Sequence, residues 1–474
     1  MKNKMITARD VDFAKWFTDV VRVARLVDYS SIKGCDVLEP NGYAIWENIQ
    51  HVLDEKFKEL GHQNVYLPLF IPESLLNKEK EHVAGFAPEV AWVTHGGENK
   101  LEERMCVRPT SETLFCNYYA NSITSYRDLP KLYNQWCNVV RWEKETRPLM
   151  RSREFLWQEG HTLHETSAEA EKEALQMLNV YREFYENYLA IPVVVGKKTE
   201  KEKFSGAEYT YTVEALMYNG VSLQSATSHY FGQKFTIPFN ITFSNRENKL
   251  EHPYQTSWGL SQRSIGGIVM VHSDDNGLVL PPRIAPVKVA IIPIVQDEAI
   301  TKKAQEIKGI LELAKIKTII DDTDKSAGFK FAEQETKGIP IRIEIGLKEM
   351  AQKEMVAVRR DDRSKTSISF ATDIAAEITK IMDNMHNDMY QKARLRNEQK
   401  TYTCTDLNQV KAVMKNGSGF IKAMWCGSLE CELKMKEING IKARCIPFNQ
   451  ERLANQCVCC GQEAKEMVIW GIQY

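Results

Sequence analysis

Helical and strand-like patterns of apolar residues follow one another along the chain. In residues 41–61, apolar side chains at 45, 49, 52, 53, 57 and 60 recur at helical spacing, and Gly61 follows. This spacing predicts an amphipathic helix that ends at the glycine. The next segment, "HQNVYLPLFIP", predicts a strand that runs up to Pro68.

Strand and helix patterns alternate regularly over residues 288–385. Apolar runs such as "VKVAIIPIV" and "IPIRIEIG" predict strands, whereas 298–315 and 372–385 have helical periodicity. "FKFAEQETKG" predicts a further helix, closed by Gly338. The alternation indicates a compact α/β domain. The run "PPRIAPVKV" before it predicts a linker, and a polar helix is expected to open the remainder of the chain from 386.

The segment "WQEGH" (157–161) has an unusual polar pattern. Side chains of a β-strand point alternately to its two faces, so Trp157, Glu159 and His161 share one face, together with Phe155. An ordinary strand presents apolar residues on its buried face. This face is therefore either solvated or lines a pocket.

Polar residues two positions apart recur in three other segments. The segments are "RPTSET" with Thr110 and Glu112, "NVVRWEKE" with Arg141 and Glu143, and "LQSATSHYFGQ" with Thr227 and His229, preceded by Gln224. One such pair alone is more typical of a solvated face. Four segments with polar alternation indicate an antiparallel sheet whose polar face forms the floor of a cavity, because antiparallel sheets can leave one face uncovered.

The residue types on this face point to a ligand class. Acids beside an indole suit an amine with an apolar body, and arginines suit a phosphate or carboxylate. The stretch from Arg141 to Phe155 predicts a β-hairpin with a basic loop, and "GLSQRSIGG" predicts a helix with Arg263 in its first turns. The sequence contains neither of the usual glycine-rich phosphate loops. A bound nucleotide would therefore be held mainly by arginines, next to an amino acid.

Length and charge narrow the possibilities further. A chain of 474 residues is expected to form two to four domains. The net charge of −1 confines nucleic-acid binding to local patches. No apolar run approaches the roughly 20 residues of a membrane helix, and the N-terminus lacks the apolar core of a secretory signal, so a cytoplasmic protein with no membrane association is expected.

Cysteines are concentrated at the end of the chain. Of 11 cysteines, seven lie in the last 71 residues, and "CGSLEC" (426–431) and "CVCCG" (457–461) hold the closest groups. Two cysteine pairs brought together form a tetrahedral four-thiolate zinc site. Cys457 can pair with either Cys459 or Cys460 at acceptable spacing. The alternative is a set of reduced, unligated thiols.

Together, "RPTSET", "VVRWE", "REFLWQEGH", "TSHYFGQ" and "GLSQRSIGG" resemble the prolyl-tRNA synthetases. These are class II aminoacyl-tRNA synthetases, and the similarity is to the archaeal/eukaryotic-like type over essentially the whole chain. The resemblance implies an α+β catalytic domain on an antiparallel sheet (1–283), an α/β anticodon-binding domain (284–385) and a small C-terminal zinc-binding-like α/β domain (386–474).

The resemblance also implies an activity. Proline and ATP form prolyl-adenylate, and the prolyl group is then transferred to tRNA(Pro), with Mg²⁺ assisting and a structural Zn²⁺ bound in the tail. A homodimer is implied, with the dimerisation motif at 41–68. Bacterial-type relatives carry an editing domain between the second and third class motifs, but residues 162–256 are all needed for the sheet. We therefore expect no cis-editing, and misactivation of alanine and cysteine.

Residue roles follow from the resemblance alone. It places these residues at proline: Thr110, Glu112, Arg141, Trp157, Glu159, His161 and His229. It places these at ATP: Arg141, Glu143, Arg151, Phe155, Gln224, Thr227 and Arg263. Arg141 and Arg263 are the expected catalytic arginines, and Glu344 is expected to read guanine edges of the anticodon. The expected zinc ligands are Cys426, Cys431, Cys457 and Cys459, with Cys460 left open against Cys459. The final Tyr474 resembles the family's terminal residue, whose carboxylate lies near the catalytic domain.

Two other hypotheses fit the same fold. A non-catalytic, synthetase-like paralogue that binds tRNA or regulates another process predicts a broken arginine or proline-pocket set. A class II enzyme for another amino acid predicts different residues in "WQEGH" and "TSHYFGQ". Both sets are intact here, which favours the prolyl enzyme.

Overall fold

One large sheet organises most of the molecule in the computed structural model, which describes residues 5–82 and 89–474. Its eleven strands follow the order β20-β21-β23-β22-β9-β10-β11-β14-β8-β7-β3. Its central strands are β9 (Val193–Lys197), β10 (Tyr209–Leu216), β11 (Ser222–Gly232), β14 (Tyr254–Ser261), β8 (Glu154–His164) and β7 (Lys131–Val140). Each pairs antiparallel with its neighbour, which confirms the expected sheet type.

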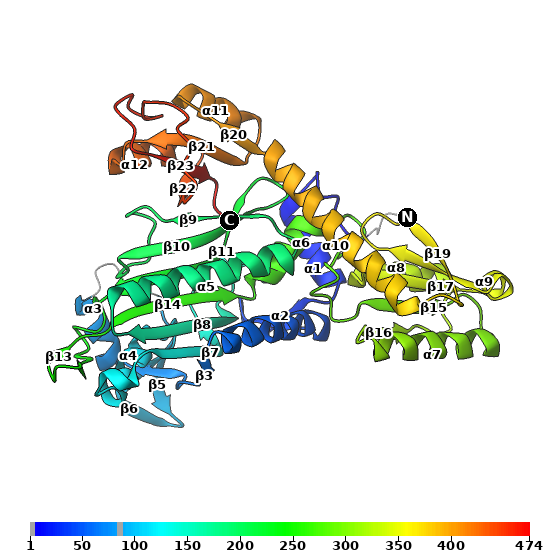
Figure 1. Ribbon diagram of the computed structural model, residues 1–474, viewed down its shortest axis with the longest axis horizontal. Coiled ribbons are helices and arrows are strands. Elements are labelled where there is room, and N and C mark those ends of the chain that lie inside the picture. Colours follow the sequence, from blue (N-terminus) through cyan, green and yellow to red (C-terminus); the bar gives the residue numbers. More distant parts are fainter. Residues whose placement is uncertain (1–4, 83–88) are drawn as a thin grey trace.

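Helices cover one face of this sheet (Figure 1). The long helix α5 (Ser167–Asn187) begins with a capping box in which the side chains of Thr166 and Glu169 bond each other's backbone amides. Its Tyr181 hydroxyl donates to Gln158 of β8 at 2.6 Å. Even-numbered residues of β8 therefore face α5, and the opposite face, with Glu159, remains for the site. Two further helices lie against this region, α2 (Pro40–Glu59) and α6 (Arg263–His272).

The strand expected at 62–68 is much shorter than the pattern indicated. Only β3 (Gln63–Asn64) pairs with β7. Beyond Val65 the chain leaves the sheet, since Pro68 has no amide hydrogen to donate. The N–H of Leu67 instead donates to the Gln135 side chain at 2.5 Å. This extended segment connects the helix at 40–59 with the site.

Smaller elements surround the large sheet. A three-stranded sheet contains β4 (Phe70–Pro72), β6 (Asn99–Val107) and β5 (Trp92–Gly96), and two-stranded sheets contain β1 (Val27–Tyr29) with β2 (Asp36–Leu38) and β12 (Phe243–Ser244) with β13 (Leu250–Glu251). The remaining helices here are α1 (Phe13–Val23), α3 (Glu73–His82) and α4 (Glu112–Ser122). Between β8 and β14 the chain forms α5 and β9–β13, which agrees with the absence of an editing insertion.

Residues 289–369 form the expected α/β unit around a five-stranded sheet. Its order is β16 (Thr318–Ile320), β15 (Val289–Pro293), β17 (Ile341–Ile345), β18 (Glu354–Arg359) and β19 (Lys365–Ser369), with the first three strands parallel. The helices are α7 (Glu298–Leu313), α8 (Ala327–Lys337) and α9 (Leu347–Gln352). Helix α8 ends at Gly338, whose φ of 79° lies in the left-handed region that glycine tolerates.

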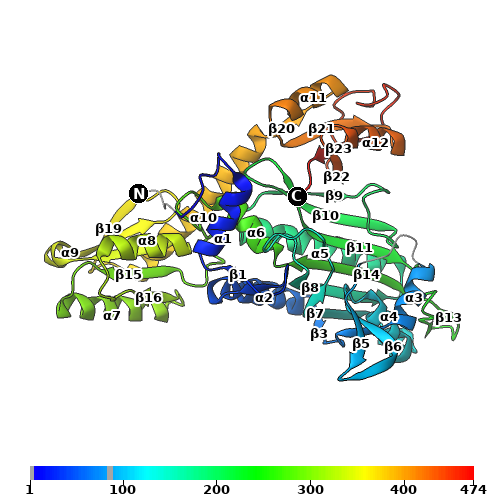
Figure 2. The same cartoon turned by 180° about the vertical axis from the view of Figure 1, so that it is seen from behind.

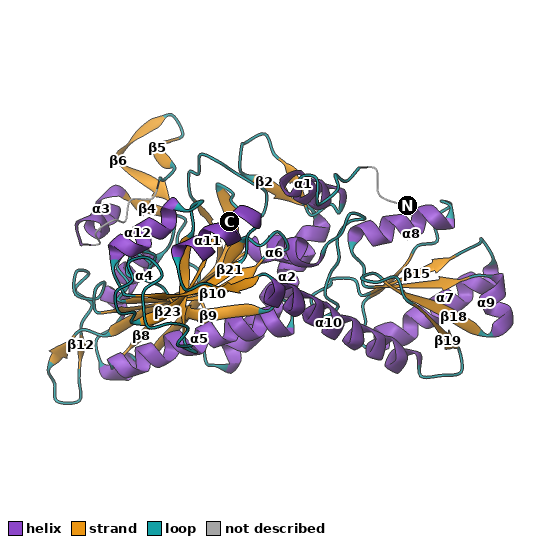
Figure 3. Ribbon diagram, turned by 90° about the horizontal axis from the view of Figure 1, so that it is seen from above, coloured by secondary structure: helices purple, strands orange, loops and turns teal. Residues whose placement is uncertain are grey.

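A single helix joins this unit to the end of the chain. The helices expected at 372–385 and from 386 onward are one element, α10 (Ile374–Gln399), as Figure 3 shows from above. Met382, Met385, Met389 and Ala393 form a continuous buried stripe on it. The helix therefore continues through the expected domain boundary at 385/386, because buried residues recur at helical spacing on both sides of it.

The C-terminal region extends the large sheet. Its elements are β20 (Thr401–Thr403), α11 (Leu407–Asn416), β21 (Phe420–Trp425), α12 (Leu429–Glu437), β22 (Lys442–Pro447) and β23 (Glu466–Gly471). Strand β22 pairs with β9, so the C-terminal strands continue the sheet formed by the central strands, as seen from behind in Figure 2. No helix in the described part of the chain has the length and apolar character needed to cross a bilayer.

Candidate active site and metal centre

A cavity of ≈ 260 Å³ lies on the polar face of the central strands. The following residues expected at proline or ATP line it: Thr110, Glu112, Arg141, Phe155, Trp157, Glu159, His161, Gln224, Thr227, His229 and Arg263. A smaller adjoining cavity of ≈ 50 Å³ shares Arg141, Phe155 and Arg263 and adds Glu143 and Arg151. The structure thus brings all the residues assigned to the two substrates to one place.

The strands supply fewer of these residues than expected. Only β8 and β11 carry their polar residues on the sheet itself. Thr110 lies in the connection before α4, and Glu112 begins that helix. Arg141 and Glu143 follow the end of β7 at Val140. Two of the four polar segments therefore lie beside strands rather than on them, and their side chains line the cavities from these connections.

A β-bulge explains the spacing on β11. The register with β10 shifts between Ala226 and Gln224, so Ser225 is an extra residue. Such a residue reverses the alternation of faces. Gln224 consequently lies on the same face as Thr227 and His229, although the spacing from 224 to 227 is odd.

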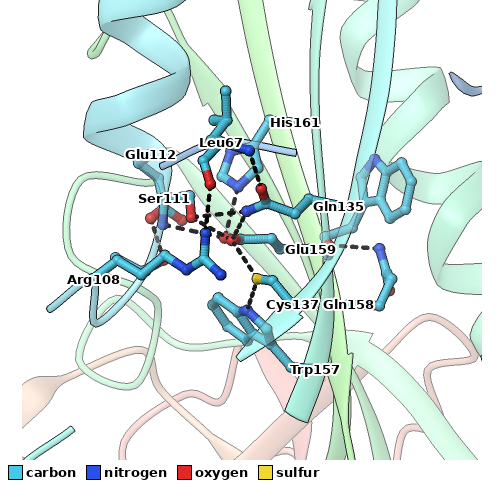
Figure 4. A network of polar contacts seen from close by, with 12 residues as sticks. Leu67, Arg108, Ser111, Glu112, Gln135, Cys137, Trp157, Gln158, Glu159 and His161 are labelled. Carbon is cyan, nitrogen blue, oxygen red and sulfur yellow. Dashed lines mark hydrogen bonds and ion pairs between the residues drawn. The ribbon is translucent and has the colours of Figure 1, made fainter. Parts of the chain in front are cut away.

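Glu159 is held by five hydrogen bonds in a buried network (Figure 4), one of them from the Cys137 thiol to Oε1 at 3.5 Å. Its Oε1 accepts from the Ser111 hydroxyl at 2.5 Å and from the Gln135 amide at 3.0 Å. Its Oε2 accepts from the Ser111 backbone at 3.2 Å and from His161 Nε2 at 3.0 Å. Burial raises the pKa of Glu159, but the hydrogen bond and charge of His161, with the other donors, lower it below its ordinary value of 4.5. The cavity floor therefore carries a fixed negative charge at neutral pH.

Two partly buried arginines, Arg141 and Arg263, also line the cavity. The Arg141 Nε donates to the Pro109 carbonyl at 3.0 Å, and the Arg263 Nε to the Met150 carbonyl at 3.0 Å. Burial lowers the pKa of both guanidinium groups, and the charge of Arg141 lowers that of Arg263 further. Two like charges placed this closely favour an anionic ligand between them.

Aromatic rings lie beside this charge. The Arg141 guanidinium carbon is 5.5 Å from the centre of the Phe155 ring and 5.3 Å from that of Trp157. The Trp157 indole donates to Cys137 Sγ at 3.2 Å. Thr110 donates its hydroxyl to Glu112, a second acid on the cavity wall. The site thus offers acids, apolar surface and arginines in adjoining positions.

His229 contributes a neutral ring. Burial lowers its pKa to about 3, so the imidazole is uncharged at neutral pH. Its Nδ1 lies 2.9 Å from the Thr210 hydroxyl, and its ring lies 4.9 Å from that of Phe204. Together with Lys203 and Glu202, Phe204 lines the cavity from a loop that the sequence patterns did not mark.

The sequence patterns also did not identify Ser111 and Gln135 as residues of the site. Gln135 faces Glu159 directly across the β7–β8 ladder. This register comes from tertiary pairing, so spacing along the chain gave no signal for it. Ser111 lies inside "RPTSET", but the two-residue alternation there selected its neighbours.

Two other expected residues lie away from this cavity or at its edge. Glu344, on β17, is only 6% exposed, and it accepts hydrogen bonds from Arg342 at 2.8 Å and 3.0 Å and from Lys365 at 3.3 Å. Its carboxylate is thus ion-paired rather than facing bulk water. Tyr474 lies against the basic loop of the hairpin, with the Arg147 guanidinium carbon 5.3 Å from its ring centre.

Four cysteines gather in the C-terminal region. The Sγ atoms of Cys426, Cys431, Cys457 and Cys460 all lie within 4.8 Å of one another. Cys426 Sγ is 3.7 Å from Cys431 Sγ and 3.8 Å from Cys460 Sγ. Tetrahedral Zn²⁺ with Zn–S bonds of about 2.3 Å requires S···S distances of about 3.8 Å, so the group fits a four-thiolate zinc site.

The fourth member of this group corrects the expected ligand set. Cys459 lies outside the group, and its Sγ contacts the Cys431 carbonyl oxygen at 3.4 Å. Cys460 takes the position expected of Cys459. Burial raises the pKa of Cys457, but backbone amides of Cys459, Cys460 and Cys426 lower it to about 7.

Three family models match successive parts of the chain. The "tRNA synthetase class II core domain (G, H, P, S and T)" matches residues 92–272. The "Anticodon binding domain" matches residues 288–380, and "Prolyl-tRNA synthetase, C-terminal" matches residues 407–474.

Curated relatives are similar over nearly the full length. A "Proline--tRNA ligase 2" of Bacillus thuringiensis subsp. konkukian (strain 97-27) is 56% identical over 471 residues, 99% of this chain and 98% of the relative. The "Proline--tRNA ligase" of Clostridium botulinum (strain Loch Maree / Type A3) and that of Clostridium novyi (strain NT) have the same identity and coverage.

Proposed function

The chain belongs to the proline--tRNA ligases, which are class II aminoacyl-tRNA synthetases, and we propose that it joins L-proline to tRNA(Pro) through a prolyl-adenylate. The observation that carries this proposal is one cavity that is lined by both a buried acid, Glu159, and a partly buried arginine, Arg141. An acid and an arginine in one cavity suit the two charges of an amino acid.

The chemistry of activation fits these groups. The proline carboxylate is itself the nucleophile that attacks the α-phosphorus of ATP, and pyrophosphate leaves. No general base is required, so the site has to supply orientation and stabilisation of negative charge. We assign that stabilisation to Arg141 at the α-phosphate and carboxylate, and to Arg263 at the γ-phosphate. Arg151, on the basic loop, is assigned to the distal phosphates.

The two substrates divide the cavity by residue type. We assign the proline ring and imino nitrogen to the end with these residues: Thr110, Glu112, Trp157, Glu159, His161 and His229. We assign ATP to the end with these: Glu143, Phe155, Gln224 and Thr227. Phe155 lies beside Arg141, so an adenine ring stacked on it would place its phosphates near the arginines.

The two expected metal ions would be held by different kinds of ligand. Arginines dominate the phosphate end, and Glu143 is the carboxylate that lines the smaller cavity there. This donor set fits Mg²⁺ carried mainly by phosphate oxygens and water, and Mg²⁺ would neutralise phosphate charge. We place a structural Zn²⁺ at Cys426, Cys431, Cys457 and Cys460, where the sulfur spacing fits it.

The remaining partners are proposals from the family. Exposed aromatic side chains at Tyr43 and Tyr66, which are 43% and 71% exposed, favour a homodimer contact along the motif at 41–68. We propose that the domain at 284–385 reads the anticodon with Glu344, and that the enzyme works in the cytoplasm.

Aminoacylation tests the proposed function. Purified protein is incubated with ATP, Mg²⁺, labelled proline and a tRNA(Pro) transcript, with a transcript carrying a changed anticodon as control. The proposal expects acid-precipitable label on tRNA(Pro) and much less on the control. If no tRNA is charged although the protein is folded, a non-catalytic, tRNA-binding paralogue is the better description.

A further inference from the structure

The loop between β9 and β10 forms one wall of the amino-acid cavity. Glu202, Lys203 and Phe204 of this loop line the cavity. The Phe204 backbone N–H donates to the Thr210 hydroxyl at 2.9 Å, and the same hydroxyl lies 2.9 Å from Nδ1 of His229. The position of the loop is therefore directly connected to the shape of the pocket.

The C-terminal region holds the beginning of this loop. Thr199, which is 2% exposed, donates its hydroxyl to Oε1 of Glu432 on α12 at 2.9 Å. The same hydroxyl accepts from the Glu202 backbone N–H at 3.3 Å. The Thr199 carbonyl accepts from the backbone N–H groups of Lys203 at 2.9 Å and Glu202 at 3.1 Å. One side chain thus connects α12 to residues that line the cavity.

Buried charges, one of them from the C-terminal region, also fix Lys198, the residue before Thr199. Lys198 Nζ donates to Glu214 Oε1 at 2.7 Å, and Arg444 on β22 donates to both oxygens of Glu214 at 3.0 Å to 3.1 Å. All three side chains are at most 3% exposed. Breaking a buried ion group by removing one member leaves an uncompensated charge, so this contact is a rigid junction between β9, β10 and β22.

We propose that Glu432 and Arg444 are positioning residues for the amino-acid site, which they reach through Thr199 and Lys198. The C-terminal region then determines how tightly proline is held, although none of its residues from 401 to 473 lines the cavity. Glu432 directly follows Cys431 of the four-cysteine group, so the metal centre supports the same helix. This inference rests on the proposed function.

Steady-state ATP–pyrophosphate exchange tests the inference with four variants. Thr199→Val and Glu432→Ala should each raise KM for proline about tenfold, the equivalent of about 1.4 kcal/mol for one hydrogen bond to a charged group. KM for ATP should stay unchanged, because the loop residues line the larger cavity but not the smaller one that holds Arg151 and Glu143. Glu432→Gln keeps an acceptor oxygen and should restore KM for proline. Glu430→Ala removes an exposed acid of the same helix and is the matched control.

The double variant and a second measurement separate positioning from simple loss of stability. Thr199→Val with Glu432→Ala should be no worse than Thr199→Val alone, because Thr199→Val already removes the contact with Glu432. Hydrogen–deuterium exchange at the amides of Glu202 and Lys203 should be faster in Glu432→Ala than in the unaltered protein, whether or not substrates are present.

Several outcomes would overturn the inference. These are an unchanged KM for proline in folded Thr199→Val, additive effects in the double variant, or equal rises in the KM values for proline and ATP. If Glu432→Ala does not fold, Thr199→Val decides, since it only exchanges a hydroxyl for a methyl group of similar size. Absence of proline-dependent exchange in the unaltered protein would instead refute the proposed function, while the amide exchange would still report on the loop.

Discussion

Replacing Glu159 with glutamine should remove most of the affinity for proline while the fold persists. Both carboxylate oxygens face donors: Oε1 faces the Gln135 amide at 3.0 Å, and Oε2 faces the Ser111 backbone N–H at 3.2 Å. A glutamine amide group must therefore meet one fixed donor whichever way it turns. Gln135 cannot rotate to accept, because its own oxygen accepts from the Leu67 N–H at 2.5 Å.

The size of the effect follows from the hydrogen bonds that glutamine cannot make. A hydrogen bond to a charged group is worth about 1.5–3 kcal/mol, and the substrate nitrogen is also deprived of its negative partner. The sum, about 3–4 kcal/mol, corresponds to a fall of about 10²–10³ in kcat/KM for proline. Proline-dependent ATP–pyrophosphate exchange measures it, with thermal unfolding to show that the variant is folded.

A matched control lies on the same strand. Glu154 begins β8 but is exposed, and it accepts one hydrogen bond, from Asn138 at 2.8 Å. Glu154→Gln should leave kcat/KM for proline unchanged. If Glu159→Gln is folded and its kcat/KM stays close to that of Glu154→Gln, then Glu159 does not hold the amino acid and the reasoning fails.

Three further predictions concern rate, metal and pH. Arg141→Ala should slow adenylate formation by about 10²–10³, measured in single turnovers, and a near-normal rate would contradict its role. Cys460→Ser should lower bound zinc, measured by elemental analysis, whereas Cys459→Ser should not; the opposite pattern would restore the original ligand choice. His229 and His272, with pKa values lowered by burial to about 3, stay neutral when folded and take up protons only on unfolding. Stability should therefore fall as pH drops from 6.5 toward 3, by up to about 1.4 kcal/mol per pH unit for each histidine. The free energy of unfolding, measured with urea at several pH values, should depend less steeply on pH in His272→Gln than in the unaltered protein. An equal dependence on pH would refute this.

The periodicity of the sequence was sufficient to predict structure where the local pattern and the tertiary structure agree. The alternation of Trp157, Glu159 and His161 placed these side chains on one face, and Gly338 correctly ended a helix. The sequence also predicted that separate segments form one cavity, because each segment is polar where a strand or strand end is usually apolar. The family resemblance then gave the ligands, which periodicity alone cannot name.

Features that depend on tertiary contacts could not be predicted. The partnership of Gln135 with Glu159 needs the register of two strands, and the bulge at Ser225 leaves no clear mark in composition. The choice between Cys459 and Cys460 depends on a single turn. Thr199 and Glu432 are 233 positions apart and meet only because β22 continues the catalytic sheet.

The measurement that tests the central claim most directly is ATP–pyrophosphate exchange with a panel of amino acids. The account predicts the highest kcat/KM with proline. It also predicts weaker exchange with alanine and cysteine, lower by about 10–200-fold for each missing methylene. If another amino acid supports faster exchange than proline, the assigned substrate is wrong. If none supports exchange in the folded protein, the cavity around Glu159 and Arg141 is not the activation site.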